Sequence, residues 1–243
     1  MGPDLAASSS PPSSDVTALG PVTRLAVQRT SDRVYEAVFA AIRDLRLLPG
    51  TLVSETELAK QLQVSRTPVR EAIARLVSAD LMRVLPQIGT LVSPISMSDV
   101  EEARFVRENL EVAVVDLVCS DPSRDVAGLH EHIAAQEAAR ARGNIDEFFA
   151  HDEAMHVELF TMSGYPGAWQ AVQRKKVQLD RLRRLSLPED ATIAELIEEH
   201  RSIVAAVAAG DDALAREHVR AHARRASRFA PALRHAHPGY FES

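Results

Sequence analysis

The chain has 243 residues, of which 46% are hydrophobic, 26% charged and 5% aromatic, so it is long and apolar enough to bury a sizeable core. Its formal net charge of −6 argues against a surface built throughout to attract nucleic acid or an anionic membrane. The single cysteine, Cys119, excludes an intramolecular disulfide and any metal site that needs three or four cysteines. Because no apolar run exceeds about seven residues, the sequence predicts neither a signal peptide nor a membrane span and favours a cytoplasmic protein.

The composition and the spacing of apolar residues change near residue 25. Residues 1–24 are rich in Ser, Pro, Ala and Gly without periodicity, which predicts a disordered tail. From Thr30 to Leu45, apolar residues recur at helical spacing, and Pro49 with the following glycine ends this helix.

Three further elements follow within about fifty residues. Ser54 and Glu57 form a capping box that predicts a two-turn helix, and another helix begins near Ser65. Apolar and polar residues then alternate on both sides of the turn at 86–89, which is typical of two short strands in a hairpin. The order of three helices and a β-hairpin over residues 25–93 predicts a winged helix-turn-helix domain.

After a linker at 94–98, the chain reads as helical, with few Gly or Pro residues and repeated capping signals. The expected helices cover residues 98–119, 124–142, 144–162, 167–186, 192–209 and 211–230. Their short connections predict an antiparallel bundle over residues 99–230, and residues 231–243 form a tail without a pattern. The predicted fold is therefore mainly α.

The charge is divided unevenly between these parts. Residues 25–97 carry nine Lys and Arg against seven Asp and Glu, a net +2 that leaves −8 for the rest of the chain. On the helix that begins near Ser65, Arg66, Thr67 and Arg70 point away from the apolar face. Such a basic and hydroxyl-bearing face suits the major groove of DNA. The small N-terminal domain is therefore expected to bind double-stranded DNA.

The segment LLPGTLVSETELAKQLQVSRTPVREAIARLVSADLMRVLPQIGTLV resembles the winged helix-turn-helix domain of the GntR family of bacterial transcription regulators. In that family the recognition helix reads operator DNA, and the wing contacts the minor groove or phosphates. The residues that the resemblance assigns to DNA are Ser65, Arg66, Thr67, Arg70, Gln87 and Gly89. Thr56 stands where some family members have arginine, and the wing turn here is not basic, so a weaker or differently placed wing contact is expected.

Four polar residues occupy positions that the helical pattern assigns to the core of the bundle. Asp152 and His156 lie one turn apart within one apolar stripe, and His200 and His222 interrupt the stripes of two later helices. Burying such groups without partners costs several kcal/mol. A shared divalent metal ion would explain all four, and the ligands suit Zn²⁺, Ni²⁺, Mn²⁺ or Fe²⁺ without choosing among them. His218, one turn before His222, is a rival ligand.

The bundle resembles the FCD domain of the FadR subgroup of GntR regulators, through ARFVRENLE, FFAHDEAMH, EEHRSIVAAVAAGD and REHVRAH. In that domain one Asp and three His bind a divalent metal, and the residues that match them here are Asp152, His156, His200 and His222. A small carboxylate effector binds beside the metal and is held by arginine. The arginines expected to bind the effector are Arg104 or Arg107 on the first bundle helix and Arg181 or Arg184 on the fourth. The alternative interpretation is that Arg104 and Arg107 form surface ion pairs with the glutamates four residues later.

The resemblance implies a homodimeric, metabolite-responsive transcription regulator, a repressor that is not an enzyme. Two alternatives remain at this stage. The first is a mononuclear metalloenzyme: Glu153 and His156 form one Glu-x-x-His pair like those of di-iron bundles, but a di-iron site needs two such pairs, and a single-metal enzyme needs a general base and an open coordination position that the sequence does not nominate clearly. A constitutive DNA-binding protein whose bundle only dimerises would leave the buried polar residues unexplained.

Overall fold

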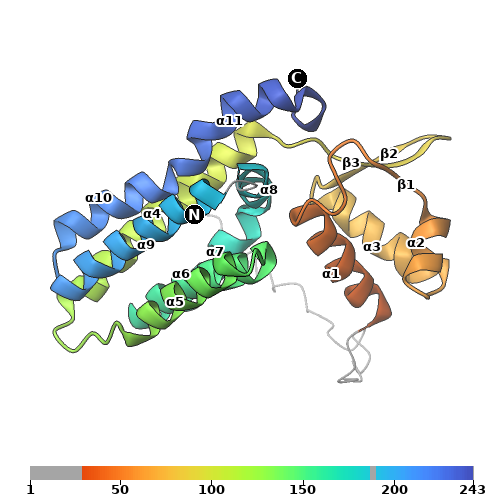
Figure 1. The fold of residues 1–243 in the computed structure, drawn as a ribbon. Helices are drawn as coiled ribbons and strands as arrows, with labels where there is room; N and C mark the ends of the chain where they lie inside the picture. The colour runs from red at the N-terminus through yellow and green to blue at the C-terminus, as the bar shows by residue number, and fades with distance from the viewer. Residues whose placement is uncertain (1–28, 187–189, 243) are drawn as a thin grey trace, which may run out of the picture.

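The computed structural model describes residues 29–186 and 190–242, so the tail expected at 1–24 lies outside the described residues. A small N-terminal head of helices and strands lies beside a larger bundle of long helices (Figure 1). This architecture confirms the predicted fold, a winged helix-turn-helix followed by an antiparallel bundle.

The head contains three helices, α1 (Thr30–Arg43), α2 (Glu55–Gln61) and α3 (Arg66–Ser78). Its strands are β1 (Leu52–Val53), β2 (Met82–Leu85) and β3 (Gly89–Val92), in the antiparallel order β1-β3-β2. The hairpin β2-β3 is the expected wing, whereas β1 is too short to give a strand pattern in the sequence. The apolar stripes of α1 and α3 meet in one core centred on Val38, Ile42 and Leu76.

The bundle is built from helices that run back and forth along one another. Their bounds are α4 (Met97–Ser120), α5 (Ala127–Ala141), α6 (Ile145–Met162), α7 (Ala168–Lys175), α8 (Val177–Ser186), α9 (Asp190–Ala209), α10 (Asp212–Ala223) and α11 (Arg225–Ala236). Asn144 supplies one of the capping signals of the bundle helices, because its side chain accepts a hydrogen bond from the Glu147 backbone N–H at 3.1 Å.

Two expected helices are each divided in the structure. The helix predicted over 167–186 breaks at Lys176, because Trp169 of α7 packs into the bundle core while Leu182 of α8 packs into a second core. The helix predicted over 211–230 breaks at Arg224, and α11 then continues into the segment that was expected to lack structure.

The C-terminal segment is ordered by its contact with the linker. Phe241 is 6% exposed and packs on Ile95, and the backbone N–H of Ile95 donates to the Tyr240 carbonyl at 2.7 Å. This second core also takes side chains from α4, α8 and α11. It therefore joins the linker, and with it the head, to the bundle. None of the described helices combines the length and apolarity needed to cross a membrane.

Candidate functional site

The bundle brings three histidines to one buried point. His156 projects from α6, His200 from α9 and His222 from α10, and each is at most 4% exposed. One ring nitrogen of each lies within 4.8 Å of those of the other two. Asp152, one turn before His156, lies beside this group with its Oδ1 3.4 Å from His200 Nε2. His218 is half-buried and is not part of the group.

Each imidazole turns its Nδ1 outward, toward an oxygen acceptor on another helix. The three contacts are His156 Nδ1 to Glu111 Oε1 at 2.9 Å, His200 Nδ1 to Gln136 Oε1 at 2.7 Å and His222 Nδ1 to Glu199 Oε2 at 3.1 Å. Because an amide oxygen and a carboxylate can only accept, the hydrogen bonds of His200 and His222 place the proton on Nδ1 and leave a lone pair on Nε2. The contact of His156 Nδ1 with Glu111 is not a hydrogen bond, and in this ring Nε2 is the acceptor because Arg107 donates to it. Partners of this kind orient histidines that bind metals.

Two of the three Nε2 atoms face one guanidinium group, and the third has no partner among the described residues. Arg107 Nη2 donates to His156 Nε2 at 2.7 Å and to His222 Nε2 at 2.9 Å, while His200 Nε2 is buried without a hydrogen-bond partner among the described residues. Burial, reinforced by neighbouring His222, lowers the pKa of His200 well below its ordinary value. Burial and the Arg107 charge do the same to the pKa of His222. Both rings are therefore neutral at neutral pH.

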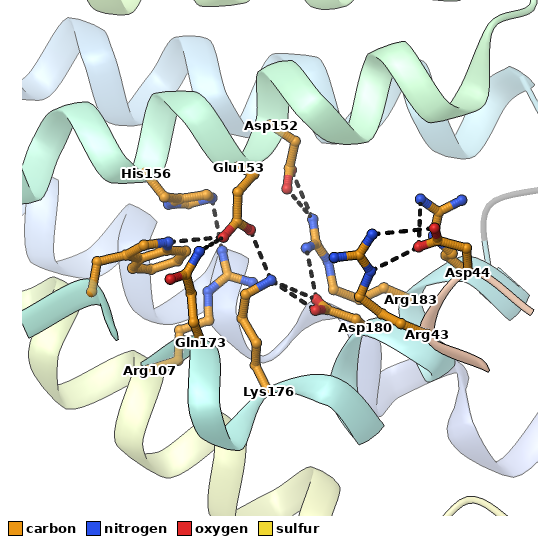
Figure 2. Close-up of polar contacts among 12 residues, drawn as sticks. Arg43, Asp44, Arg107, Asp152, Glu153, His156, Gln173, Lys176, Asp180 and Arg183 are labelled. Carbon is orange, nitrogen blue, oxygen red and sulfur yellow. Dashed lines mark hydrogen bonds and ion pairs between the residues drawn. The ribbon is translucent and has the colours of Figure 1, made fainter. Parts of the chain in front are cut away.

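Asp152 is ionised and is held by an arginine. Burial alone would raise the pKa of Asp152, but the charge of Arg183, with Nη2 2.7 Å from both carboxylate oxygens, holds it well below its usual range. Figure 2 shows Arg183 reaching from α8 to this carboxylate. Three converging imidazoles, of which His200 has an Nε2 without a hydrogen-bond partner among the described residues, and an adjacent carboxylate form a donor set that fits a divalent transition metal.

The four arginines predicted to bind an effector lie in different surroundings. Arg107 is at the histidines, with its Nε donating to Glu111 at 2.9 Å. Arg104 pairs instead with Glu101 and Glu108 along α4, as the alternative interpretation of its spacing expected.

The other two predicted arginines lie on the head side of α8. Arg181 is fully buried, donates to the Ser93 carbonyl of the linker at 2.7 Å, and has a pKa lowered to about 10 by burial. Arg184 pairs with Asp44 of the head and with Asp146. Arg183, which sequence reasoning missed, faces the site instead, because the break at Lys176 sets the rotation of α8 independently of α7.

The head presents the expected basic face. Arg66, Thr67 and Arg70 are exposed on α3, whose opposite face is buried in the head core. Arg66 and Arg70 each donate to the same Glu55 oxygen at 3.3 Å, so the two guanidinium groups lie side by side. In the wing, Gln87 is exposed at the tip, where its φ of 63° makes the turn between β2 and β3.

An exposed basic helix in a winged helix-turn-helix head, joined to a bundle with a buried polar centre, defines a regulator that binds DNA. Residues 30–92 match the family described as bacterial regulatory proteins, gntR family, and residues 102–225 match the FCD domain. The chain belongs to the GntR family of transcription regulators and carries an FCD domain, which confirms the resemblance seen in the sequence. The family consists of DNA-binding regulators, so the metalloenzyme alternative is set aside.

Relatives of known sequence agree with this assignment. An HTH-type transcriptional regulator in an unstable DNA locus of Streptomyces ambofaciens is 38% identical over 81% of this chain and 83% of its own length. The HTH-type transcriptional repressor RspR of Escherichia coli K12 is 30% identical over 74% of this chain and 79% of its own. A probable D-xylose utilization operon transcriptional repressor of Paenarthrobacter nicotinovorans is 28% identical over 89% and 94%.

Solved structures share the fold. Escherichia coli McbR/YncC superposes with a TM-score of 0.68 at 23% identity, over 87% of this chain and all of the other. A putative GntR transcriptional regulator from Rhodococcus sp. RHA1 gives a TM-score of 0.69 at 21% identity, over 83% and 98%.

The buried histidines predict a pH-dependent stability. Because the pKa values of His200 and His222 are lowered on folding, the unfolded chain takes up protons below its ordinary histidine pKa of about 6.5 while the folded chain does not. In metal-free protein, the free energy of unfolding should fall as the pH drops from 7.5 to 5.5, by up to about 1.4 kcal/mol per pH unit for each histidine. Urea denaturation measures this slope.

His200→Gln should remove about half of the slope, because one of the two buried imidazoles is then absent. His130→Gln, at an exposed position on α5, is the control and should leave the slope unchanged. If the free energy of unfolding of the wild type did not change with pH, or if His200→Gln kept the slope of the wild type, the assignment of neutral buried imidazoles would be contradicted.

Proposed function

We propose that this regulator is a homodimeric, cytoplasmic repressor whose binding to operator DNA responds to a small carboxylate metabolite and a divalent metal in the bundle. The observation that carries the proposal is that one ring nitrogen of each of His156, His200 and His222 converges on one buried point. The Nδ1 atoms of His200 and His222 are hydrogen-bonded to Gln136 and Glu199, and the Nε2 of His200 has no hydrogen-bond partner among the described residues. Repression is supported by relatives that are named repressors.

His156, His200 and His222, with Asp152 beside them, would hold the cation through neutral nitrogens and one carboxylate oxygen. When bound, it supplies a Lewis-acidic position to which a carboxylate can bind. Arg107 could not share the Nε2 lone pairs of His156 and His222 with a second cation, so its Nη2 would be available to bind that carboxylate. Arg107 is thus the effector-binding arginine that we propose, and Arg183, which lines the same small cavity, would hold Asp152 in place.

The space beside the histidines supports a regulatory role. Arg107, Arg183 and His222 line a cavity of about 20 Å³, enough for roughly one water molecule. A carboxylate ligand therefore enters only if the surrounding side chains and helices shift. Such a shift, favoured in the liganded state, would change how the bundle holds the head and hence how the two recognition helices of a dimer meet successive major grooves.

Arg70→Ala tests the reading of DNA by α3. An operator selected from random duplexes should bind the variant with a loss of roughly 1–3 kcal/mol, because a bidentate contact to guanine is removed. The affinity for random DNA should fall by less, because the substitution removes only one positive charge that attracts phosphate groups. Fluorescence anisotropy at fixed salt measures both affinities, with Arg220→Ala, an exposed arginine on α10, as the control. Equal losses on both DNAs would argue against base reading by Arg70.

His200→Asn tests the metal site. Purified protein loaded with Zn²⁺ or Mn²⁺ and dialysed should retain less metal per chain in this variant, because one neutral nitrogen ligand is lost. Elemental analysis measures the ratio, circular dichroism checks that the variant is folded, and His130→Asn is the surface control. Undiminished metal in folded His200→Asn would remove His200 from the proposed site.

A further inference from the structure

The C-terminal segment 237–242 contacts parts of the molecule that bear on DNA binding. It follows α11 and makes one 3₁₀ turn over Pro238–Tyr240, in which the rings of His237 and Tyr240 stack with their centroids 5.1 Å apart. Figure 1 shows this end of the chain beside the linker, where the linker enters the head. We call residues 237–242 the strap.

The strap is joined to the linker by its backbone and by one buried side chain. The Ile95 N–H donates to the Tyr240 carbonyl at 2.7 Å, and the Glu242 N–H donates to the Ile95 carbonyl at 3.0 Å, as in a short pair of parallel strands. Phe241, between these two bonds, is 6% exposed and shares a core with Ile95 and with Leu182 of α8. A displacement of the linker alone would therefore break two hydrogen bonds and an apolar contact.

The strap also reaches the sheet of the head. The Gly239 carbonyl oxygen lies 3.8 Å from the position that a Cβ of Gly50 would take, next to the start of β1. The Glu242 carboxylate forms an ion pair with Arg83 of β2. Arg83 is the only charged residue of the wing, residues 82–92. The one charge of the wing is therefore paired with the strap.

The register of the sheet shows that this pair holds the wing from its outer face. Arg83 lies opposite Leu91 of β3, which lies opposite Leu52 of β1, so these three side chains share one face of the sheet. Met82 and Val92 lie on the other face and are buried in the head core. The head core thus holds one face of the hairpin at its base, and the strap holds the other.

We propose that Phe241 and Glu242 are positioning residues for DNA binding, and that the strap transmits the placement of the bundle to the wing. Phe241 shares its core with Leu182, the neighbour of Arg183 on α8, so a shift of α8 reaches Arg83 through the strap. The bundle then acts on the wing directly as well as through the recognition helix. This inference needs only the DNA binding of the family and does not depend on a metal at the histidines.

The same ion pair has a second interpretation, in which Arg83 binds a DNA phosphate and Glu242 competes with the DNA. The geometry favours positioning, because Arg83 lies near the base of the hairpin, whereas the exposed tip is at Gln87. The two roles predict opposite effects of Glu242→Gln. Loss of a positioning contact weakens DNA binding, whereas loss of a competing carboxylate strengthens it.

Binding of the full chain to an operator selected from random duplexes separates these roles. Glu242→Gln and Arg83→Gln should each weaken binding by roughly two- to fivefold, the range for loss of an exposed ion pair. The double variant should bind no more weakly than the weaker single variant, because both substitutions break the same contact. Glu217→Gln and Arg220→Gln, at exposed positions on α10, are the controls matched in charge.

Fluorescence anisotropy at several salt concentrations supplies a second readout. The slope of log affinity against log salt should stay at the wild-type value in both variants, because a positioning contact adds no phosphate contact. If Glu242→Gln binds more tightly than Glu217→Gln, or if Arg83→Gln reduces the slope by about one, Arg83 contacts phosphate and the positioning role is wrong. Affinities equal to those of the controls would also overturn it.

Hydrogen exchange of the free protein tests the part of Phe241. Phe241→Ala should speed the exchange of the β2–β3 amides, and Phe241→Leu, which keeps most of the apolar contact, should stay close to the wild type. A role confined to the second core would speed exchange in α8 and α11 and leave the hairpin unchanged, which would contradict the proposal. Circular dichroism checks folding, and if Phe241→Ala does not fold, Glu242→Gln at the surface provides the same hairpin readout.

Discussion

The bundle depends on the mutual satisfaction of charges that have been removed from water. A lone buried carboxylate or guanidinium would cost several kcal/mol, so Asp152, Arg107 and Arg183 are tolerated only because each meets a partner at about hydrogen-bond distance. The partners come from α4, α6, α8 and, through the histidines, α9 and α10. Apart from Arg107 with Glu111 and Arg183 with Asp180, these charges meet partners on other helices, so they fix how the helices pack against one another.

Helix α8 extends this constraint to the DNA-binding head. Arg183 faces the site carboxylate, the adjacent Arg184 bonds to Asp44 at the end of α1, and Arg181 bonds to the linker carbonyl of Ser93. Three arginines within two turns therefore join the buried centre, the head and the linker. A change at the histidines that moved Arg183 would act on these two contacts as well, and this is a physical route from the bundle to DNA binding.

The sequence predicted the parts of this arrangement that follow from periodicity. His156, His200 and His222 were evident because each interrupts an apolar stripe, and the recognition helix was evident from its two faces and a family motif. Arg183 was not, because the side of α8 that faces the core depends on the break at Lys176. The sequence also failed to predict that the C-terminal segment is structured. Phe241 is buried against Ile95 of the linker, nearly 150 residues earlier in the chain, and local sequence patterns do not report such a contact.

The central claim is that the inward nitrogens of the three histidines bind a metal ion. Anomalous diffraction from crystals loaded with Zn²⁺ tests it most directly. The account predicts one strong anomalous peak about 2.0–2.1 Å from Nε2 of His156, His200 and His222, with Arg107 turned away from these nitrogens. A peak elsewhere, or histidines that keep their bonds to Arg107 in saturating Zn²⁺, would contradict it.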